Sequence, residues 1–100
     1  MIHGDTVYLA GMVAEDPSAD TRGQTEQILR KIDATLKAVG SDRSKLLSAQ
    51  IFITDMRNFA DMNAVWDAWV DRENTPARAT VQASLANPKM LVEIMVVAAL

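Results

Sequence analysis

Residues 91–100 read LVEIMVVAAL, and this stretch decides the fold more than any other part of the chain. Side chains of a strand alternate between the two faces of a sheet. One face of this segment carries residues 91, 93, 95, 97 and 99, and the other carries residues 92, 94, 96, 98 and 100. Both faces are apolar, and Glu93 is the single exception. We therefore expect a strand that has to be covered on both sides.

The need to cover both faces of that strand predicts an assembly of more than one copy of the chain. The apolar periodicity of the sequence predicts two helices, which cover only one face of a small sheet. Aliphatic surface left in water costs about 25 cal/mol per Å², and a large bare apolar patch usually marks an interaction site. We expect a homo-oligomer whose subunits bring their open sheet faces together. The alternative is a monomer in which the chain's own loops, which are short, cover this face.

The rest of the chain divides into alternating strand and helix segments. Strands are predicted near residues 7–9 and over 47–54, 78–83 and 91–100, and residues 47, 49, 51 and 53 share one apolar face. A first helix begins at Asp20 or Thr21 and stops at Gly40. A second helix, capped by Asn58, carries its apolar residues on one side until the break at residues 74–76. This order predicts an α+β fold with both helices on one side of one sheet.

Composition and charge exclude several classes of protein. A chain of 100 residues fits one domain over residues 1–100. Its 10 Lys and Arg against 13 Asp and Glu, with no basic cluster, argue against nucleic acid as a partner. The absence of cysteine excludes disulfides and thiolate nucleophiles, and a lone histidine, His3, excludes a two-histidine metal site in one chain. Without a secretory signal or an apolar run long enough to cross a bilayer, we expect a cytoplasmic protein without a membrane partner.

Two charged side chains stand where charges are unfavourable. Arg78 begins a predicted strand after Pro76, and Glu93 interrupts an aliphatic run. A buried carboxylate is costly unless it is paired or hydrogen-bonded, and a guanidinium presents a planar fork that suits a carboxylate. In one interpretation Arg78 and Glu93 pair with each other or hold subunits together. In the other, Arg78 binds a small anionic molecule and Glu93 positions a water.

The remaining candidates are weaker. Trp66 and Trp69 are interpreted as core or interface packing, and Phe59 as packing or as the wall of a pocket. Asn63 is interpreted as a structural hydrogen-bonding residue. No serine has a histidine base nearby in sequence, and no glycine-rich phosphate loop is present.

Several segments together resemble one family. They are Leu9-Ala10-Gly11, Ile53-Thr54-Asp55-Met56 followed by Phe59, Met62-Asn63 with Trp66, Pro76-Ala77-Arg78-Ala79-Thr80-Val81 and Val92-Glu93-Ile94. This pattern, which extends over essentially the whole chain, is similar to that of the Rid family of reactive intermediate deaminases, the YjgF or RidA type. The arginine segment and the glutamate segment at this spacing are specific, whereas either alone is weak.

The resemblance implies a chorismate-mutase-like α+β fold, a mixed sheet with two helices on one face, and a homotrimer whose sheets form a central barrel with clefts between subunits. It also implies hydrolysis, without cofactor or metal, of 2-enamines and 2-imino acids such as 2-aminoacrylate and 2-iminopropionate to 2-keto acids and ammonia. By this resemblance Arg78 binds the substrate carboxylate and Glu93 orients the attacking water. Phe59 lines the cleft, and backbone near Gly11, Ala79 and Thr80 contacts the ligand.

The chain departs from the pattern of many deaminases in this family at three places. Ala10 stands where many members have a serine, and Thr80 stands where many have a cysteine. A segment with a pocket tyrosine that usually precedes the first clear strand is absent from this sequence. Two alternatives therefore accompany the deaminase prediction: a non-catalytic protein that binds small carboxylates or a partner protein, and a deaminase of a different enamine.

Overall fold

The computed structural model describes residues 1–100 and contains two α-helices and six β-strands. The helices are α1 (Thr21–Ala38) and α2 (Phe59–Trp69). The strands are β1 (Ile2–His3), β2 (Thr6–Tyr8), β3 (Met12–Val13), β4 (Leu46–Ile53), β5 (Ala77–Gln82) and β6 (Val92–Ala99). Short 3-10 helices, Arg43–Lys45 and Met56–Asn58, precede β4 and α2. The predicted order of the main elements is confirmed, whereas β1 and β3 were not predicted because two-residue strands carry no periodic signal.

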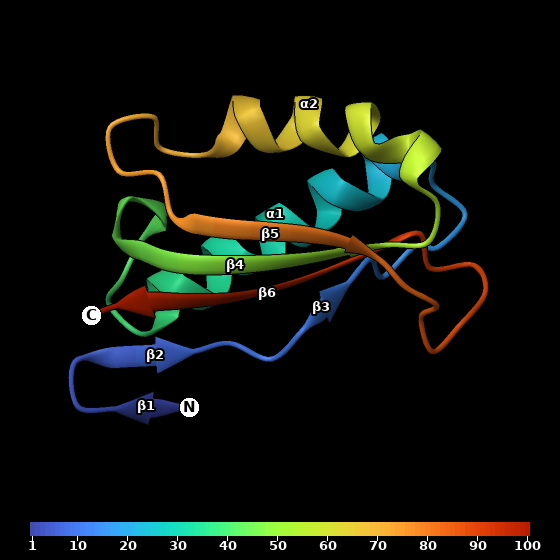
Figure 1. Ribbon diagram of the computed structural model, residues 1–100. Coiled ribbons are helices and arrows are strands. Elements are labelled where there is room, and N and C mark those ends of the chain that lie inside the picture. The colour runs from blue at the N-terminus through green and yellow to red at the C-terminus, as the bar shows by residue number, and fades with distance from the viewer.

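The six strands form one mixed sheet in the order β1-β2-β6-β4-β5, and β3 also pairs with β6. Only β4 and β5 are parallel, and every other pair is antiparallel. A parallel pair needs a crossover connection, and α2 supplies it. Figure 1 shows α1 behind the sheet and α2 along the β5 edge. The site described below lies under α2 at this edge.

Helix α1 begins and ends where its capping residues predict. The Asp20 side chain accepts a hydrogen bond from the Gly23 backbone N–H at 2.8 Å, which satisfies a donor that the first turn leaves free. After the last turn, Gly40 has a φ of 81°, a left-handed conformation that a side chain disfavours. Between them, an apolar stripe that includes Ile28, Ile32 and Leu36 is fully buried.

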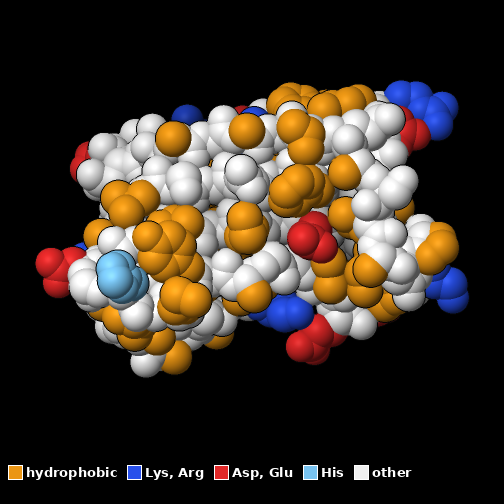
Figure 2. All heavy atoms as spheres, turned by 60° about the horizontal axis from the view of Figure 1, so that its bottom comes forward, with side chains coloured by type: hydrophobic (Ala, Val, Ile, Leu, Met, Phe, Trp, Pro, Cys, Tyr) orange, Lys and Arg blue, Asp and Glu red, His pale blue; other side chains and the backbone are white.

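Alternation along β6 separates a covered face from an open one. Residues 92, 94, 96 and 98 are at most 1% exposed and lie in the core with both helices, whereas Met95 between them is 38% exposed. In Figure 2 the bottom of Figure 1, where β1 and β2 lie, is turned forward, and this view shows many apolar side chains and few charged ones. The prediction of an open apolar face is therefore confirmed for a single chain.

The start of β4 corrects one part of the predicted alternation. A register shift between Leu46 and Ser48 places Leu46, 5% exposed, in the core and leaves Leu47 50% exposed. Such an irregularity adds a residue to one strand and reverses the pattern on either side of it. The prediction that Leu47 shares a face with Ala49 is therefore wrong, because the alternating pattern of the sequence does not reveal the shift.

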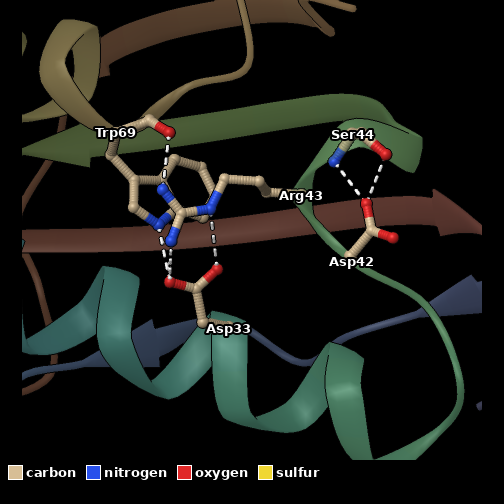
Figure 3. A network of polar contacts seen from close by, with 5 residues as sticks. All are labelled: Asp33, Asp42, Arg43, Ser44 and Trp69. Atoms are coloured by element: carbon tan, nitrogen blue, oxygen red, sulfur yellow. Dashed lines mark hydrogen bonds and ion pairs between the residues drawn. The ribbon is translucent and has the colours of Figure 1, made fainter.

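A polar network fixes the C-terminal end of α2 (Figure 3). Asp33 of α1 accepts hydrogen bonds from Arg43 Nη2 at 2.6 Å, from Arg43 Nε at 3.2 Å and from Trp69 Nε1 at 2.9 Å. Arg43 Nη1 also donates to the Trp69 carbonyl oxygen at 2.9 Å. The network joins α1, the turn before β4 and α2, so it holds α2 in place relative to the sheet. No helix of the structure combines the length and apolar character needed to span a bilayer.

Candidate functional site

Arg78 lies on the edge strand of the sheet and faces α2. In the parallel pairing of β4 with β5, Arg78 is opposite Ala49, which is only 2% exposed on the helix-covered side. Residues paired across strands share a face, so the half-buried Arg78 side chain enters the space between β5 and α2. Strand β5 has no further neighbour in the sheet, and this space therefore lies at the margin of the chain.

Three residues of α2 hold the Arg78 guanidinium. Its Cζ lies 5.9 Å from the ring centroid of Phe59 and 5.5 Å from that of Trp66, distances typical of cation–π contacts. Between the two rings, Asn63 Oδ1 accepts a hydrogen bond from Arg78 Nη1 at 2.7 Å. Residues 59, 63 and 66 are four and three positions apart, so they lie on one face of the helix. Asn63 is thus a hydrogen-bonding residue, as predicted, and Trp66 has a role beyond packing.

Most of the donor capacity of Arg78 is unused within the chain. A guanidinium carries five N–H groups, and Arg78 makes a single hydrogen bond, to Asn63. The three ion pairs of the chain join Arg22 to Asp61, Arg43 to Asp33 and Arg57 to Asp55. No carboxylate of the chain therefore balances the charge of Arg78, and its Nε–Nη2 edge has no hydrogen-bond partner within the chain.

Glu93 lies on the opposite face of the sheet, close to Gly11. It pairs with Phe52 of β4 and with Val13 of β3, and it is half-buried on the open face. A Cβ atom at Gly11 would lie 2.5 Å from Glu93 Oε2 and 3.1 Å from its Cδ, so a larger residue at position 11 would displace the carboxylate from this position. Glu93 forms no ion pair and accepts no hydrogen bond within the chain. In a single chain this half-buried carboxylate has no protein partner, and one side of it is accessible.

One chain thus contains two separate halves of the predicted site. Arg78 lies against Phe59 of α2, whereas Glu93 and Gly11 lie together on the open face. The interpretation in which Arg78 pairs with Glu93 inside one chain is wrong. Strand parity explains this, because Arg78 is paired with a core residue of β4, while Glu93 is paired with a residue on the other face.

The two residues after Arg78 point in opposite directions. Ala79 is exposed and lines, together with Gln50, Met95 and Arg78, a shallow hollow of about 400 Å³ at the β5 edge. Thr80 pairs with the fully buried Ile51, and its hydroxyl is buried without a hydrogen-bond partner. The side chain of Thr80 therefore shares the Arg78 side of the strand, and Ala79 faces the other side, while Arg78 itself also contributes to the wall of the hollow.

Asp55 stands at the junction of β4 and α2. Hydrogen bonds from Arg57, first from its side chain and then from its backbone, hold the pKa of Asp55 below its ordinary value. The charged carboxylate caps the short helix Met56–Asn58, and Asn58 itself makes no side-chain cap bond to α2. Asn58 therefore stands at the predicted N-cap position of α2 without a capping hydrogen bond, and Asp55 caps the short helix that precedes it. No group of three or more His, Cys, Asp or Glu side chains is arranged to hold a metal ion.

Comparison with known proteins places this geometry in a family. The family described as Endoribonuclease L-PSP matches residues 1–100. The chain belongs to the Rid/YjgF/RutC family. It is 50% identical over 99 residues to the RutC family protein YoaB of Escherichia coli K12, an alignment that covers 99% of this chain and 86% of that protein.

Solved structures of Rid-family proteins share the fold. A YjgF-family member from Neisseria meningitidis is 44% identical, has a TM-score of 0.92, and is matched over 95% of this chain and 79% of its own. RidA from an Antarctic Psychrobacter is 28% identical with a TM-score of 0.91, over 100% of this chain and 85% of its own. The predicted family and its α+β sheet with two helices are therefore confirmed.

Proposed function

We propose that this Rid-family chain binds small 2-imino acids and hydrolyses them, without a cofactor, to 2-keto acids and ammonia. The observation that carries the proposal is the state of Arg78. Its guanidinium is held by Phe59, Trp66 and Asn63, and no carboxylate of the chain neutralises it. A cation kept in place with an unused donor edge is suited to a ligand carboxylate.

The guanidinium accounts for binding and orientation. Two parallel N–H groups of an arginine match the two oxygens of a carboxylate, and such charge-assisted pairs are among the stronger hydrogen bonds in proteins. Because the two aromatic rings restrict the plane of the Arg78 guanidinium, a bound carboxylate takes a defined direction. The C=N carbon next to that carboxylate is then held in one place, which favours attack by a positioned water.

Glu93 supplies the acceptor for the water proton. In the proposed step the water oxygen bonds to the imine carbon, Glu93 accepts the proton that this water loses, and the C=N electron pair passes to the nitrogen, which takes a proton from solvent. Glu93 then gives its proton to the amino nitrogen of the carbinolamine. The C–N bond breaks as the hydroxyl loses its proton to solvent and becomes the C=O group, so ammonia leaves and a 2-keto acid remains. No electron is exchanged with another molecule. Ordinary hydrolysis of imines is already fast, and a modest lowering of the barrier is enough for this function, since about 1.4 kcal/mol gives a tenfold rate.

The cleft itself requires a second copy of the chain. Arg78 and Glu93 lie on opposite faces of one sheet, so a cleft that contains both takes them from different subunits. The open apolar face, on which Met95 is 38% exposed, favours burial against other copies. We include a homotrimer in the proposal, with Phe59, Arg78, Ala79 and Thr80 from one subunit and Gly11 and Glu93 from its neighbour.

The decisive experiment measures hydrolysis of 2-iminopropionate, formed in situ by oxidation of alanine, with the unaltered chain and with Arg78→Ala. We expect the acceleration to disappear in the variant. Arg30→Ala is the matched control, because Arg30 is exposed on α1 and lies away from Arg78. Equal rates of ammonia release with the unaltered chain and with Arg78→Ala would contradict the proposal.

The shared cleft has its own test. Arg78→Ala and Glu93→Ala are each expected to be inactive. When the two variants are unfolded and refolded together in equal amounts, about a quarter of the sites should recover. Each site then takes its arginine and its glutamate independently from different copies, and about half of the copies carry each residue intact. If mixed assemblies form and no activity returns, both residues act from one subunit and the proposed arrangement is wrong.

One observation favours binding without turnover as a second candidate function. The carboxylate-binding half of the site is complete within one chain, whereas Glu93 is remote from it. Calorimetry with 2-ketobutyrate separates the two functions when it is set beside turnover, because binding of 2-ketobutyrate without accelerated imine hydrolysis selects the non-catalytic function. Ala10 and Thr80, where many relatives differ, make another enamine a reasonable further substrate to assay.

A further inference from the structure

The Asn63 side chain is held from both ends. Its Oδ1 accepts from Arg78 Nη1 at 2.7 Å, and its Nδ2 donates to Asp67 Oδ2 at 3.2 Å. Asn63 and Asp67 are four residues apart on α2, so both lie along the same side of the helix. This series of contacts continues from an exposed carboxylate, through a half-buried amide, to the guanidinium of the proposed binding site.

The two neighbours of Asn63 allow only one orientation of its amide. A carboxylate accepts hydrogen bonds and a guanidinium only donates them. If the amide were reversed, its NH₂ would face the donors of Arg78 and its oxygen would face the carboxylate of Asp67. Both contacts would then be repulsive. Asp67 therefore ensures that an oxygen, and not an NH₂ group, is presented to Arg78.

The neutrality of this acceptor determines which part of Arg78 stays available. The Asn63 oxygen accepts one N–H of Nη1 without cancelling the positive charge, and the Phe59 and Trp66 rings restrict rotation of the guanidinium plane. With Nη1 held on the α2 side, the Nε–Nη2 edge is directed away from Asn63. A carboxylate in the same position would instead attract that edge and neutralise it.

We propose that Asn63, oriented by Asp67, is a positioning residue that keeps the Nε–Nη2 edge of Arg78 free for the carboxylate of the ligand. The inference rests on the proposed function for the identity of the ligand. The positioning itself is a property of the unliganded chain and can be measured separately. Asp67 is exposed and joins no ion pair, so a role in holding the fold does not explain its contact with Asn63.

The experiment compares four variants. Asn63→Leu removes the acceptor, Asp67→Ala removes the orienting group, and Asp67→Asn keeps an oxygen that can accept from Asn63. Asp61→Ala is the matched control, because it removes an acid of the same helix whose partner is Arg22. Each variant is measured for 2-ketobutyrate affinity by calorimetry, for kcat and KM with 2-iminopropionate, and for rotation of the Arg78 guanidinium by side-chain nitrogen NMR.

Loss of one hydrogen bond to a charged group predicts about a tenfold rise in KM and in the 2-ketobutyrate Kd for Asn63→Leu, with a smaller rise for Asp67→Ala. The kcat should change little, and Asp67→Asn and Asp61→Ala should resemble the unaltered chain. Guanidinium rotation should become faster in Asn63→Leu and Asp67→Ala. Unchanged rotation and affinity in both variants would overturn the inference.

The two proposals fail in different ways. If the unaltered chain neither binds 2-ketobutyrate nor accelerates hydrolysis, the proposed function is wrong. The NMR measurement still decides whether Asn63 and Asp67 position Arg78, since it needs no ligand. If the unaltered chain is active and the variants keep both its affinity and its Arg78 rotation, only the positioning role is wrong.

Discussion

Two arginines of this protein stack on tryptophans of the same helix, and they differ in their polar partners. The Cζ of Arg43 lies 5.0 Å from the Trp69 ring centroid, and that of Arg78 lies 5.5 Å from the Trp66 ring centroid. Arg43 donates to the Asp33 carboxylate and to a backbone carbonyl. Arg78 has only the Asn63 amide as an acceptor. A carboxylate balances the charge of the first arginine, and none balances that of the second.

The difference separates a structural arginine from one that is available for binding. In the Arg43 network the donors are used to join α1 to the end of α2, and the pair is partly exposed, with 41% of the Arg43 side chain accessible. Around Arg78 the same aromatic support is kept, but the carboxylate is replaced by a neutral oxygen. The charge and an unused donor edge are therefore preserved at the β5 margin. Two predictions change the partners of these arginines, and a third concerns the neighbouring cap at Asp42.

The largest effect is expected when Arg78 is given the kind of partner that Arg43 has. Asn63→Asp places a carboxylate next to the guanidinium, and we expect it to form an ion pair that occupies the free edge. Competition from such a pair should weaken 2-ketobutyrate binding by about tenfold to a hundredfold, the range for a lost hydrogen bond to a charged group. Calorimetry measures this change. Undiminished affinity would mean that a neutral partner is not what keeps Arg78 available.

A moderate effect on stability alone is expected when Arg43 loses its carboxylate. Asp33→Ala removes the acceptor shared by Arg43 and Trp69, and a partly exposed network of this kind contributes about 1 kcal/mol. For a domain of this size that corresponds to a fall in Tm of about 4–8 °C, which thermal unfolding measures. The 2-ketobutyrate affinity should be unchanged. A drop in affinity as large as that of Asn63→Asp would show that the two regions are not independent.

The smallest effect concerns Asp42, which caps the short helix Arg43–Lys45. Hydrogen bonds from the Ser44 side chain and backbone hold the pKa of Asp42 below its ordinary value of 3.8. The charged form is thus favoured by folding, so its contribution to stability is present above the unfolded pKa and is lost as the pH falls through the lower folded pKa. We expect the unaltered chain to be slightly more stable than Asp42→Asn at neutral pH, and the difference to vanish in acid.

Ser44→Ala provides the control for that titration. It removes the hydrogen bond that contributes most to the shift, so the pKa of Asp42 should rise toward its ordinary value, as followed by NMR. An Asp42 that titrates at the same pH with and without Ser44 would contradict the assignment of the cause.

Much of the fold could be predicted because its signals are local. The apolar stripe of α1, its stop at Gly40 and the two-faced apolar pattern of β6 all belong to continuous stretches of sequence. The errors fall where pairing between distant segments decides the outcome. The register shift beside Leu47 and the short strands β1 and β3 are produced by contacts with β6 and β2 that no local pattern reveals.

The candidate site was predictable in composition but not in arrangement. Arg78 and Glu93 stand out in the sequence because a charge inside an apolar or strand-forming segment is unfavourable. Trp66 was interpreted as packing, and the spacing of Phe59, Asn63 and Trp66 on one helix face was the available signal that they surround one group. The identity of that group depends on which face of β5 is turned toward α2.

Two helices, an open apolar sheet face and two charges that need an explanation could be inferred from the residues alone, since each follows from a pattern within a single segment. The position of the two charges on opposite faces of the sheet could be seen only in the folded chain. The side on which a strand residue emerges depends on its register with a neighbouring strand and on the helix packed above it, and both come from parts of the chain far away in sequence.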